Sequence, residues 1–161
     1  MTDKTLLPPI IIINVSLDTS ATPRVLALDD GNGKNILGTN NTQQVIRWVL
    51  TDTSLTFVPM SEIKPGFEWI SALSASQPIF GSVTISADGR FIEVGDMHDS
   101  IASRGVWCYL LRARHTDGTI YETRLVFNRV LALGPEITDS EGRPAAYARM
   151  TVKNNPVIIN R

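Results

Sequence analysis

The segment GVWCYLLRARHTDGTIYETRLVFNR, residues 105–129, decides the fold class, because its pattern specifies a long β-hairpin in one register. A three-residue loop over 116–118, with Gly118 in the left-handed conformation, makes a bulged turn between two strands. A two-residue loop would place two arginines on the apolar face. Since one residue of slip reverses the face of every side chain, the hydrophobic pattern selects the bulged turn. The pairs expected in this register are Trp107 with Phe127, Tyr109 with Leu125, Ala113 with Tyr121 and Arg112 with Glu122.

A second hairpin is predicted in SVTISADGRFIEV, residues 82–94. The dipeptide Asp88-Gly89 suits a two-residue type I′ turn, in which both central residues have positive φ. The pairs expected here are Ile85 with Ile92, Val83 with Val94 and, on the opposite face, Thr84 with Glu93.

The rest of the chain repeats this short alternation, broken by Gly, Asp, Asn and Pro, and lacks long helical periodicity. Its 161 residues are most simply one domain, 1–161. The count and spacing of the strands predict an all-β fold, a two-sheet antiparallel β-sandwich. The expected strands lie near 9–17, 24–29, 44–50, 54–59, 82–87, 90–95, 105–114, 119–128, 148–153 and 156–160.

Two terminal segments are unusually apolar: PPIIIINV, residues 8–15, and NPVIINR, residues 155–161. Four isoleucines are far too few to cross a bilayer, which needs about 20 apolar residues, and no signal-peptide cleavage site follows them. Both segments are expected to be strands of the sandwich, covered on both faces over part of their length. Contact with a second subunit would explain isoleucine at consecutive positions, because a strand covered on one face should alternate.

Composition argues against several classes of partner. The net charge of −1 gives no general attraction to nucleic acid or to a membrane, and the arginines are scattered along the chain. The single cysteine, Cys108, excludes an intrachain disulfide and is expected to be a buried, unreactive thiol. These features predict a soluble protein of the cytoplasm.

No metal or cofactor site is predicted. In the loop DDGNGKN, residues 29–35, Lys34 stands where a calcium ligand would be needed. Asp96 and His98, in GDMHDS at 95–100, are alternate residues that together offer at most a weak metal site. The plainer alternative is that Asp96 or Asp99 caps a turn.

No catalytic constellation is recognisable either. The chain has two histidines and lacks the Gly-x-Ser-x-Gly motif of a nucleophile elbow, so we expect no enzyme activity. Phe67 and Trp69, in the irregular stretch 60–81, are the candidate ligand-binding residues, as a platform on which a sugar ring could stack. The alternative is that both rings close the end of the sandwich.

The strand VWCYLLRA, the turn TDG, the following strand and the terminal NPVIIN resemble the DP-EP family of small uncharacterised bacterial proteins. The resemblance covers the C-terminal third. It differs at Asn155, where the family has aspartate, and in the added segment LALGPEITDSEGRPAAYAR that follows the hairpin. It implies a single immunoglobulin-like sandwich in a bacterial protein and transfers no catalytic residue.

Together these features predict a non-enzymatic module that binds a protein partner or associates with copies of itself as a homo-oligomer. The alternative is a carbohydrate-binding module that uses Phe67 and Trp69.

Overall fold

The computed structural model describes residues 7–29, 34–37, 43–70, 79–97, 105–123, 134–135 and 156–160. Every regular element within these ranges is a strand, so the all-β prediction is confirmed. The strands are β1 (Ile10–Asp18), β2 (Val25–Leu28), β3 (Lys34–Leu37), β4 (Gln44–Leu50), β5 (Leu55–Phe57), β6 (Phe67–Trp69), β7 (Thr84–Ile85), β8 (Phe91–Asp96), β9 (Gly105–His115), β10 (Ile120–Glu122), β11 (Gly134–Pro135) and β12 (Val157–Asn160).

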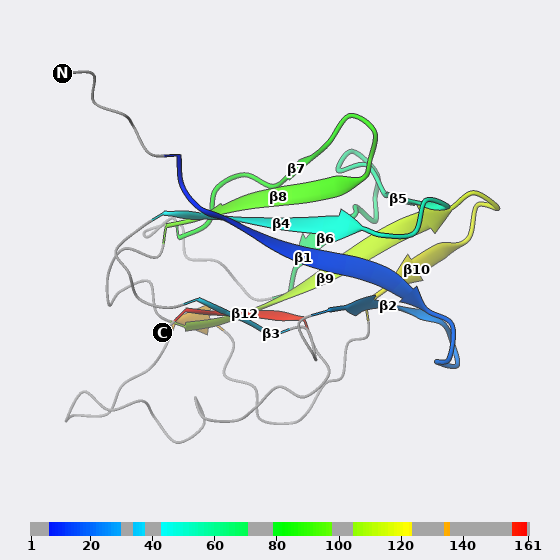
Figure 1. Ribbon diagram of the computed structural model, residues 1–161, viewed down its shortest axis with the longest axis horizontal. Helices are drawn as coiled ribbons and strands as arrows, with labels where there is room; N and C mark the ends of the chain where they lie inside the picture. Colours follow the sequence, from blue (N-terminus) through cyan, green and yellow to red (C-terminus); the bar gives the residue numbers. More distant parts are fainter. Residues whose placement is uncertain are drawn as a thin grey trace.

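The strands form two sheets (Figure 1). One has five strands in the order β2-β1-β4-β8-β7. The other has seven and is built on β9, which pairs with β5, β6, β10, β11 and β12, while β3 pairs with β12. Most neighbours are antiparallel, as predicted, but β1 pairs in parallel with β4, and β12 in parallel with β3. A parallel pair needs a long connection between its strands, and the many residues between each of these pairs supply it.

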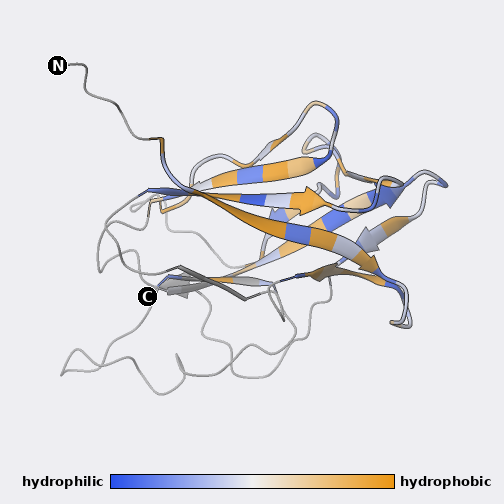
Figure 2. Ribbon diagram, in the orientation of Figure 1, coloured by the Kyte–Doolittle hydropathy of each residue, from blue (hydrophilic) through white to orange (hydrophobic). Residues whose placement is uncertain are grey.

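The hydrophobic core lies between the two sheets. Strand β4 shows how it is built, because its burial alternates and the side chains of Ile46, Trp48 and Leu50 are buried. Figure 2 colours each residue by its hydropathy and shows hydrophilic residues between hydrophobic ones along β4 and β8. Other buried members of the core, from both sheets, are Ile13, Val15, Leu26, Leu55, Phe57, Phe67, Ile92, Val94, Tyr109, Leu111, Ala113 and Ile158.

The hairpin of β9 and β10 has the predicted register. Tyr121 is opposite Ala113 and Glu122 is opposite Arg112. The His115 N–H donates to the Thr119 carbonyl, which closes a three-residue loop, and Gly118 has a φ of 90°. The bulged turn selected by the hydrophobic pattern is therefore confirmed.

The same hairpin does not supply all of the predicted partners. Where β10 ends, β12 continues along β9, and Ile158 is opposite Trp107. The predicted partners Leu125 and Phe127 lie outside the described residues. The C-terminal strand therefore completes the ladder on which the sequence placed the rest of the hairpin.

The hairpin of β7 and β8 has the predicted pairing but a different turn. Thr84 is opposite Glu93 and Ile85 is opposite Ile92, as expected. However, the Gly89 N–H donates to the Ser86 carbonyl, so the tight turn is centred on residues 87–88 rather than on Asp88-Gly89. The hydroxyl of Ser86 accepts hydrogen bonds from the N–H groups of the two residues after Gly89, and these side-chain bonds replace the expected type I′ turn.

Both apolar terminal segments form strands, as predicted, but β1 is not covered on both faces. Its burial alternates, with Ile13 and Val15 buried and Ile10 and Ile12 exposed. Strand β9 is buried on both faces over part of its length, where Cys108 and Leu110 are nearly as buried as Tyr109 and Leu111.

Three short strands were not predicted: β3, β6 and β11. Each has only two to four residues, too few to show an alternating pattern. The expected strand at 148–153 lies outside the described residues. Within the described ranges, no helix has the length and apolar character needed to cross a bilayer.

Candidate interaction surface

The two aromatic residues proposed as a ligand platform belong to β6. Phe67 is opposite Leu111 of β9 and is 2% exposed, so its ring leaves no face on which a sugar could stack. Trp69 is half-buried, and its ring centroid lies 4.6 Å from that of Phe80 and 4.9 Å from that of Phe67. These contacts place both rings in the packing between the sheets.

The proposed weak metal pair is only partly described. Asp96 is completely buried, and its Oδ1 accepts a hydrogen bond of 3.2 Å from Nδ2 of Asn160. His98 and Asp99 lie outside the described residues, as do residues 30–33 of the rejected calcium loop. In the part of the chain that is described, no group of three or more His, Cys, Asp or Glu residues could hold a metal ion.

Cys108 is buried in β9, as the sequence predicted. Burial raises the pKa of its thiol to about 11. Because the thiolate is the nucleophilic form, burial and the raised pKa both disfavour reaction of this thiol at neutral pH.

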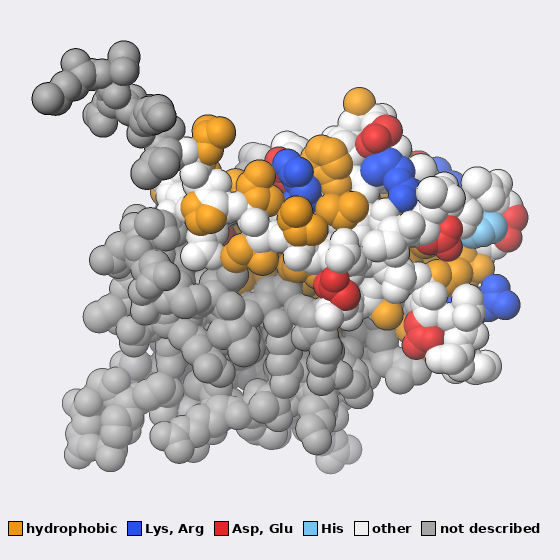
Figure 3. Space-filling model, in the orientation of Figure 1, with side chains coloured by type: hydrophobic (Ala, Val, Ile, Leu, Met, Phe, Trp, Pro, Cys, Tyr) orange, Lys and Arg blue, Asp and Glu red, His pale blue; other side chains and the backbone are white. Residues whose placement is uncertain are grey.

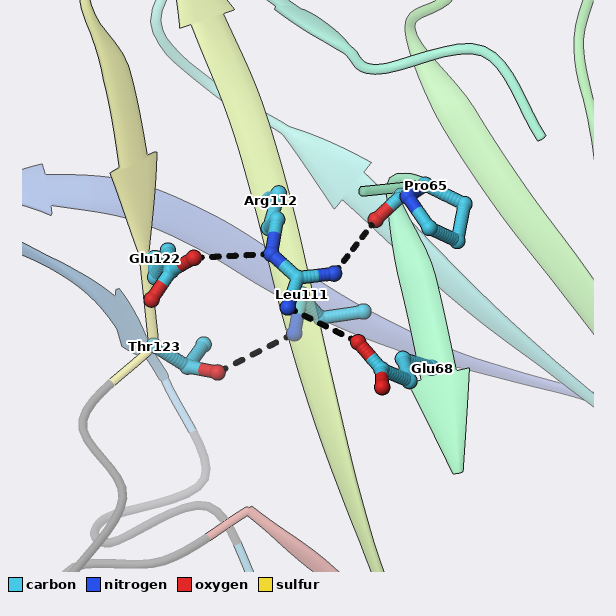
Figure 4. Close-up of polar contacts among 6 residues, drawn as sticks. All are labelled: Pro65, Glu68, Leu111, Arg112, Glu122 and Thr123. Carbon is cyan, nitrogen blue, oxygen red and sulfur yellow. Dashed lines mark hydrogen bonds and ion pairs between the residues drawn. The ribbon is translucent and has the colours of Figure 1, made fainter. Parts of the chain in front are cut away.

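A charged cluster lies on the face of β9 that points away from the other sheet (Figure 4). Arg112 is 7% exposed, and its Nε donates to Glu122 of β10 over 2.7 Å. Its other nitrogens contact Glu68 of β6 at 2.8 Å and the Pro65 carbonyl at 3.1 Å. One guanidinium thus joins β9 to a strand on each side and to the loop before β6.

The surroundings of Arg112 favour its charged form. Burial would lower the pKa of its guanidinium, but hydrogen bonds to Glu122 and Glu68 outweigh burial and raise that pKa. Arg114, two residues along the strand, makes a two-pronged ion pair with Glu62, at 3.1 and 2.7 Å. The hydrogen bond from Arg114 lowers the pKa of the Glu62 carboxyl. Arg112 thus pairs with glutamates of the two flanking strands, and Arg114 pairs with a glutamate of the loop between β5 and β6, so the cluster is a structural clamp.

A different kind of surface lies on the outer face of the five-stranded sheet. Ile10 is 48% exposed and Ile12 is 58% exposed, although both belong to a regular strand. Their neighbours on this face include the half-buried Val45 and Val49 of β4 and Phe91 of β8. Figure 3 shows hydrophobic side chains gathered over β1, β4 and β8 around a basic side chain. We call these five residues the apolar face.

One ion pair interrupts the apolar face. Arg47 of β4 is opposite Ile12 on one side and Glu93 of β8 on the other. Its Nε donates to Glu93 over 2.6 Å, and its guanidinium carbon lies 4.6 Å from the centre of the Phe91 ring. The basic group is therefore neutralised and stacked on an aromatic ring, which makes this surface less polar than its composition suggests.

Beside the apolar face, no strand in the described part of the chain pairs with the edge of β1 beyond the end of β2. Strand β2 pairs with β1 only over Val15–Asp18, and the Asp29 N–H adds one more bond, to the Asn14 carbonyl. On the opposite edge, the Pro9 carbonyl accepts a hydrogen bond from the N–H of Val45 in β4. The Val15 carbonyl accepts one from the N–H of Thr51, the residue after β4. Since backbone groups alternate between the two edges of a strand, odd-numbered residues of β1 bond to β4 and even-numbered residues face β2.

The backbone groups of Ile10 and Ile12 therefore point along an edge where no described strand lies. Among the described residues, none donates to or accepts from these groups across that edge. An exposed edge with apolar side chains is the arrangement that natural proteins usually blunt with charge, and here residues 7–13 carry no charge at all. The consecutive isoleucines were the sequence signal for this surface, but the sequence could not show which of them face outward or that the edge is open.

Comparison with known proteins adds no relative: no protein-family model, no curated protein and no solved structure matches this chain.

Proposed function

We propose that this protein is a non-enzymatic interaction module that binds another protein, or copies of itself, through the apolar face and the open edge of β1. The observation that carries the proposal is the combination of exposed isoleucine side chains and open backbone groups at Ile10 and Ile12. An extended segment added to such an edge gains backbone hydrogen bonds and, on the outer face, apolar contact.

A binding role is also supported over a catalytic role by how the described reactive groups are used. Arg112 and Arg114 are held in ion pairs, and the Cys108 thiol is buried with a raised pKa. The sugar-binding alternative is weakened because the Phe67 ring is enclosed in the core.

The immunoglobulin-like arrangement and the likeness to the DP-EP family are part of the same proposal. They are supported by the way the resembling segments associate, since the TDG turn joins β9 to β10 and the NPVIIN segment pairs with β9 as β12. We further propose that the protein acts in a bacterial cytoplasm, for which the single buried cysteine is the supporting feature.

The test is a pull-down from a bacterial cytoplasmic extract, combined with light scattering of the purified chain. Wild type is compared with Ile12→Lys, which puts a charge on the apolar face, and with Ile63→Lys as the matched control. Ile63 is 101% exposed and lies in the loop before β6, so it belongs neither to β1 nor to the apolar face. We expect either a captured protein or an oligomer that is lost with Ile12→Lys and kept with Ile63→Lys. A monomer that captures the same proteins as Ile12→Lys would contradict the proposal.

A further inference from the structure

We infer that the occupant of the open β1 edge is the β1 edge of a second copy of this chain, paired antiparallel about a twofold axis at Ile11. This inference rests on the proposed function and specifies its partner. It follows from which backbone groups are free, from where the free edge stops, and from the charge of the segment.

The free edge is bounded on both sides. Toward the C-terminus it stops at Asn14, whose carbonyl accepts from the Asp29 N–H at 3.1 Å and whose N–H donates to the Asp29 carboxylate at 3.1 Å. Toward the N-terminus it stops at Pro8, which has no N–H to donate. Among the described residues, no hydrogen bond on this edge is made by the N–H and C=O of Ile10 and of Ile12 or by the C=O of Pro8.

These groups can pair with those of a second copy that runs antiparallel. With Ile11 on the twofold axis, Ile10 of each copy is opposite Ile12 of the other, and each N–H meets a C=O. A shift by two residues in one direction would place Pro8 opposite Ile12, so that the Ile12 C=O meets no donor and the Ile12 side chain lies beside proline instead of isoleucine. A shift in the other direction would place Ile10 opposite Asn14, whose groups are already bonded to Asp29. The register with Ile11 on the axis is therefore the one in which Ile10 and Ile12 of each copy both lie opposite an isoleucine of the other copy.

The side chains agree with the backbone. On the outer face, each exposed Ile10 would lie beside the Ile12 of the other copy, giving a continuous row of β-branched side chains across the new sheet. Residues 7–13 are uncharged, so bringing the segment against its copy creates no like-charge repulsion. In such a twofold contact the edges of both copies are paired with each other, so neither remains exposed. An open-ended array of copies would always leave one edge unpaired.

The inference is tested by disulfide trapping of full-length single-cysteine additions. Ile10→Cys and Ile12→Cys proteins are mixed and oxidised with glutathione disulfide, and each is also oxidised alone. Directly opposite residues in antiparallel strands have Cα atoms about 5.5 Å apart, within disulfide range, whereas diagonal positions are about 7 to 8 Å apart. The native Cys108 is buried and stays out of the reaction.

We expect the mixed pair to cross-link at least about tenfold faster than Ile12→Cys alone, and faster than a mixture of Ile12→Cys with the exposed control Ile63→Cys. Equal rates in all mixtures, or a monomeric mass at the highest soluble concentration, would overturn the inference. If such a monomer still captures a protein that is lost with Ile12→Lys, only the self-pairing fails. If it captures none, the proposed function fails as well.

Discussion

The indole N–H of Trp48 donates a hydrogen bond of 2.9 Å to the hydroxyl oxygen of Tyr109, and this bond joins the two sheets inside the core. Trp48 belongs to β4 and Tyr109 to β9, and both side chains are fully buried. Their ring centroids are 5.0 Å apart. A buried donor is thus satisfied across the interface of the sheets, where water cannot replace its partner.

Removing the Tyr109 hydroxyl, which accepts this hydrogen bond, is expected to destabilise the fold. Tyr109→Phe leaves the Trp48 N–H buried without this partner, which should lower the free energy of unfolding by about 1–3 kcal/mol. Urea denaturation followed by Trp fluorescence measures this loss. The matched control is Tyr121→Phe on the same hairpin, where the side chain is only half-buried. Equal stability of the two variants would contradict the role given to this bond.

The arginine clamp predicts a contrast between two neighbouring positions. Arg112→Met should lower the free energy of unfolding by about 2 kcal/mol, less than the ~3–5 kcal/mol of a fully buried pair, because its glutamate partners can regain water. Glu68 and Glu122 have side chains 46% exposed. Arg114→Met removes a pair whose members are more than a third exposed and should cost about 1 kcal/mol or less. Chemical denaturation of the two variants measures both losses. If Arg114→Met were the less stable variant, the role given to Arg112 would be contradicted.

In the bulged turn, adding a side chain at Gly118 should lower the free energy of unfolding because of the backbone conformation alone. A Cβ added there meets no atom within 4 Å, so Gly118→Ala tests only the φ of 90° and should cost about 1–2 kcal/mol. Gly95 is equally uncrowded, and its φ lies outside the left-handed region, so Gly95→Ala is the matched control and should be neutral or stabilising. Thermal unfolding of both variants measures the difference. A Gly118→Ala variant as stable as the control would rule out the left-handed turn.

The turn after β4 predicts a defined pH dependence. The Ser54 hydroxyl and N–H donate to Asp52, which lowers the pKa of that carboxyl from 3.8. A lowered pKa in the folded state stabilises the fold above the unfolded value and loses this contribution as the pH falls through the folded value. Asp52→Asn should therefore be less stable than wild type at neutral pH, and the difference should shrink below pH 3.8.

The same measurement on Ser54→Ala should give a smaller version of the effect, since the backbone bond remains. A difference between wild type and Asp52→Asn that does not change with pH would show that the carboxylate contributes nothing through its charge.

The sequence predicts strand pairing well between segments that are close along the chain, and poorly between segments that are distant. The pairing of Arg112 with Glu122 was predictable because a short loop and the alternation of side chains fix the register. The pairing of Trp107 with Ile158 was not, since residues distant in sequence meet there and no local pattern selects between partners. Phe67 looked like a loop residue because its strand, β6, is only three residues long.

The candidate surface could also be predicted only in part. The run of isoleucines at 10–13 marked the segment as unusual, but consecutive apolar residues do not reveal which side chains face outward. That depends on the parallel pairing with β4, in which Ile13 is opposite the buried Trp48 and Ile12 is opposite Arg47. The open edge depends in turn on where β2 leaves β1, at Asn14, which is a property of the topology.

Amide hydrogen exchange along β1, measured by NMR at several protein concentrations, tests the central claim most directly. At low concentration the N–H groups of Ile11 and Ile13 should be protected by the ladder to β4, and that of Ile12 should exchange rapidly. Raising the concentration should protect the Ile12 amide while leaving Ile11 and Ile13 unchanged. If the Ile12 amide is as protected as that of Ile13 at every concentration, the edge is closed within one chain. The account of β1 as the interaction edge is then wrong.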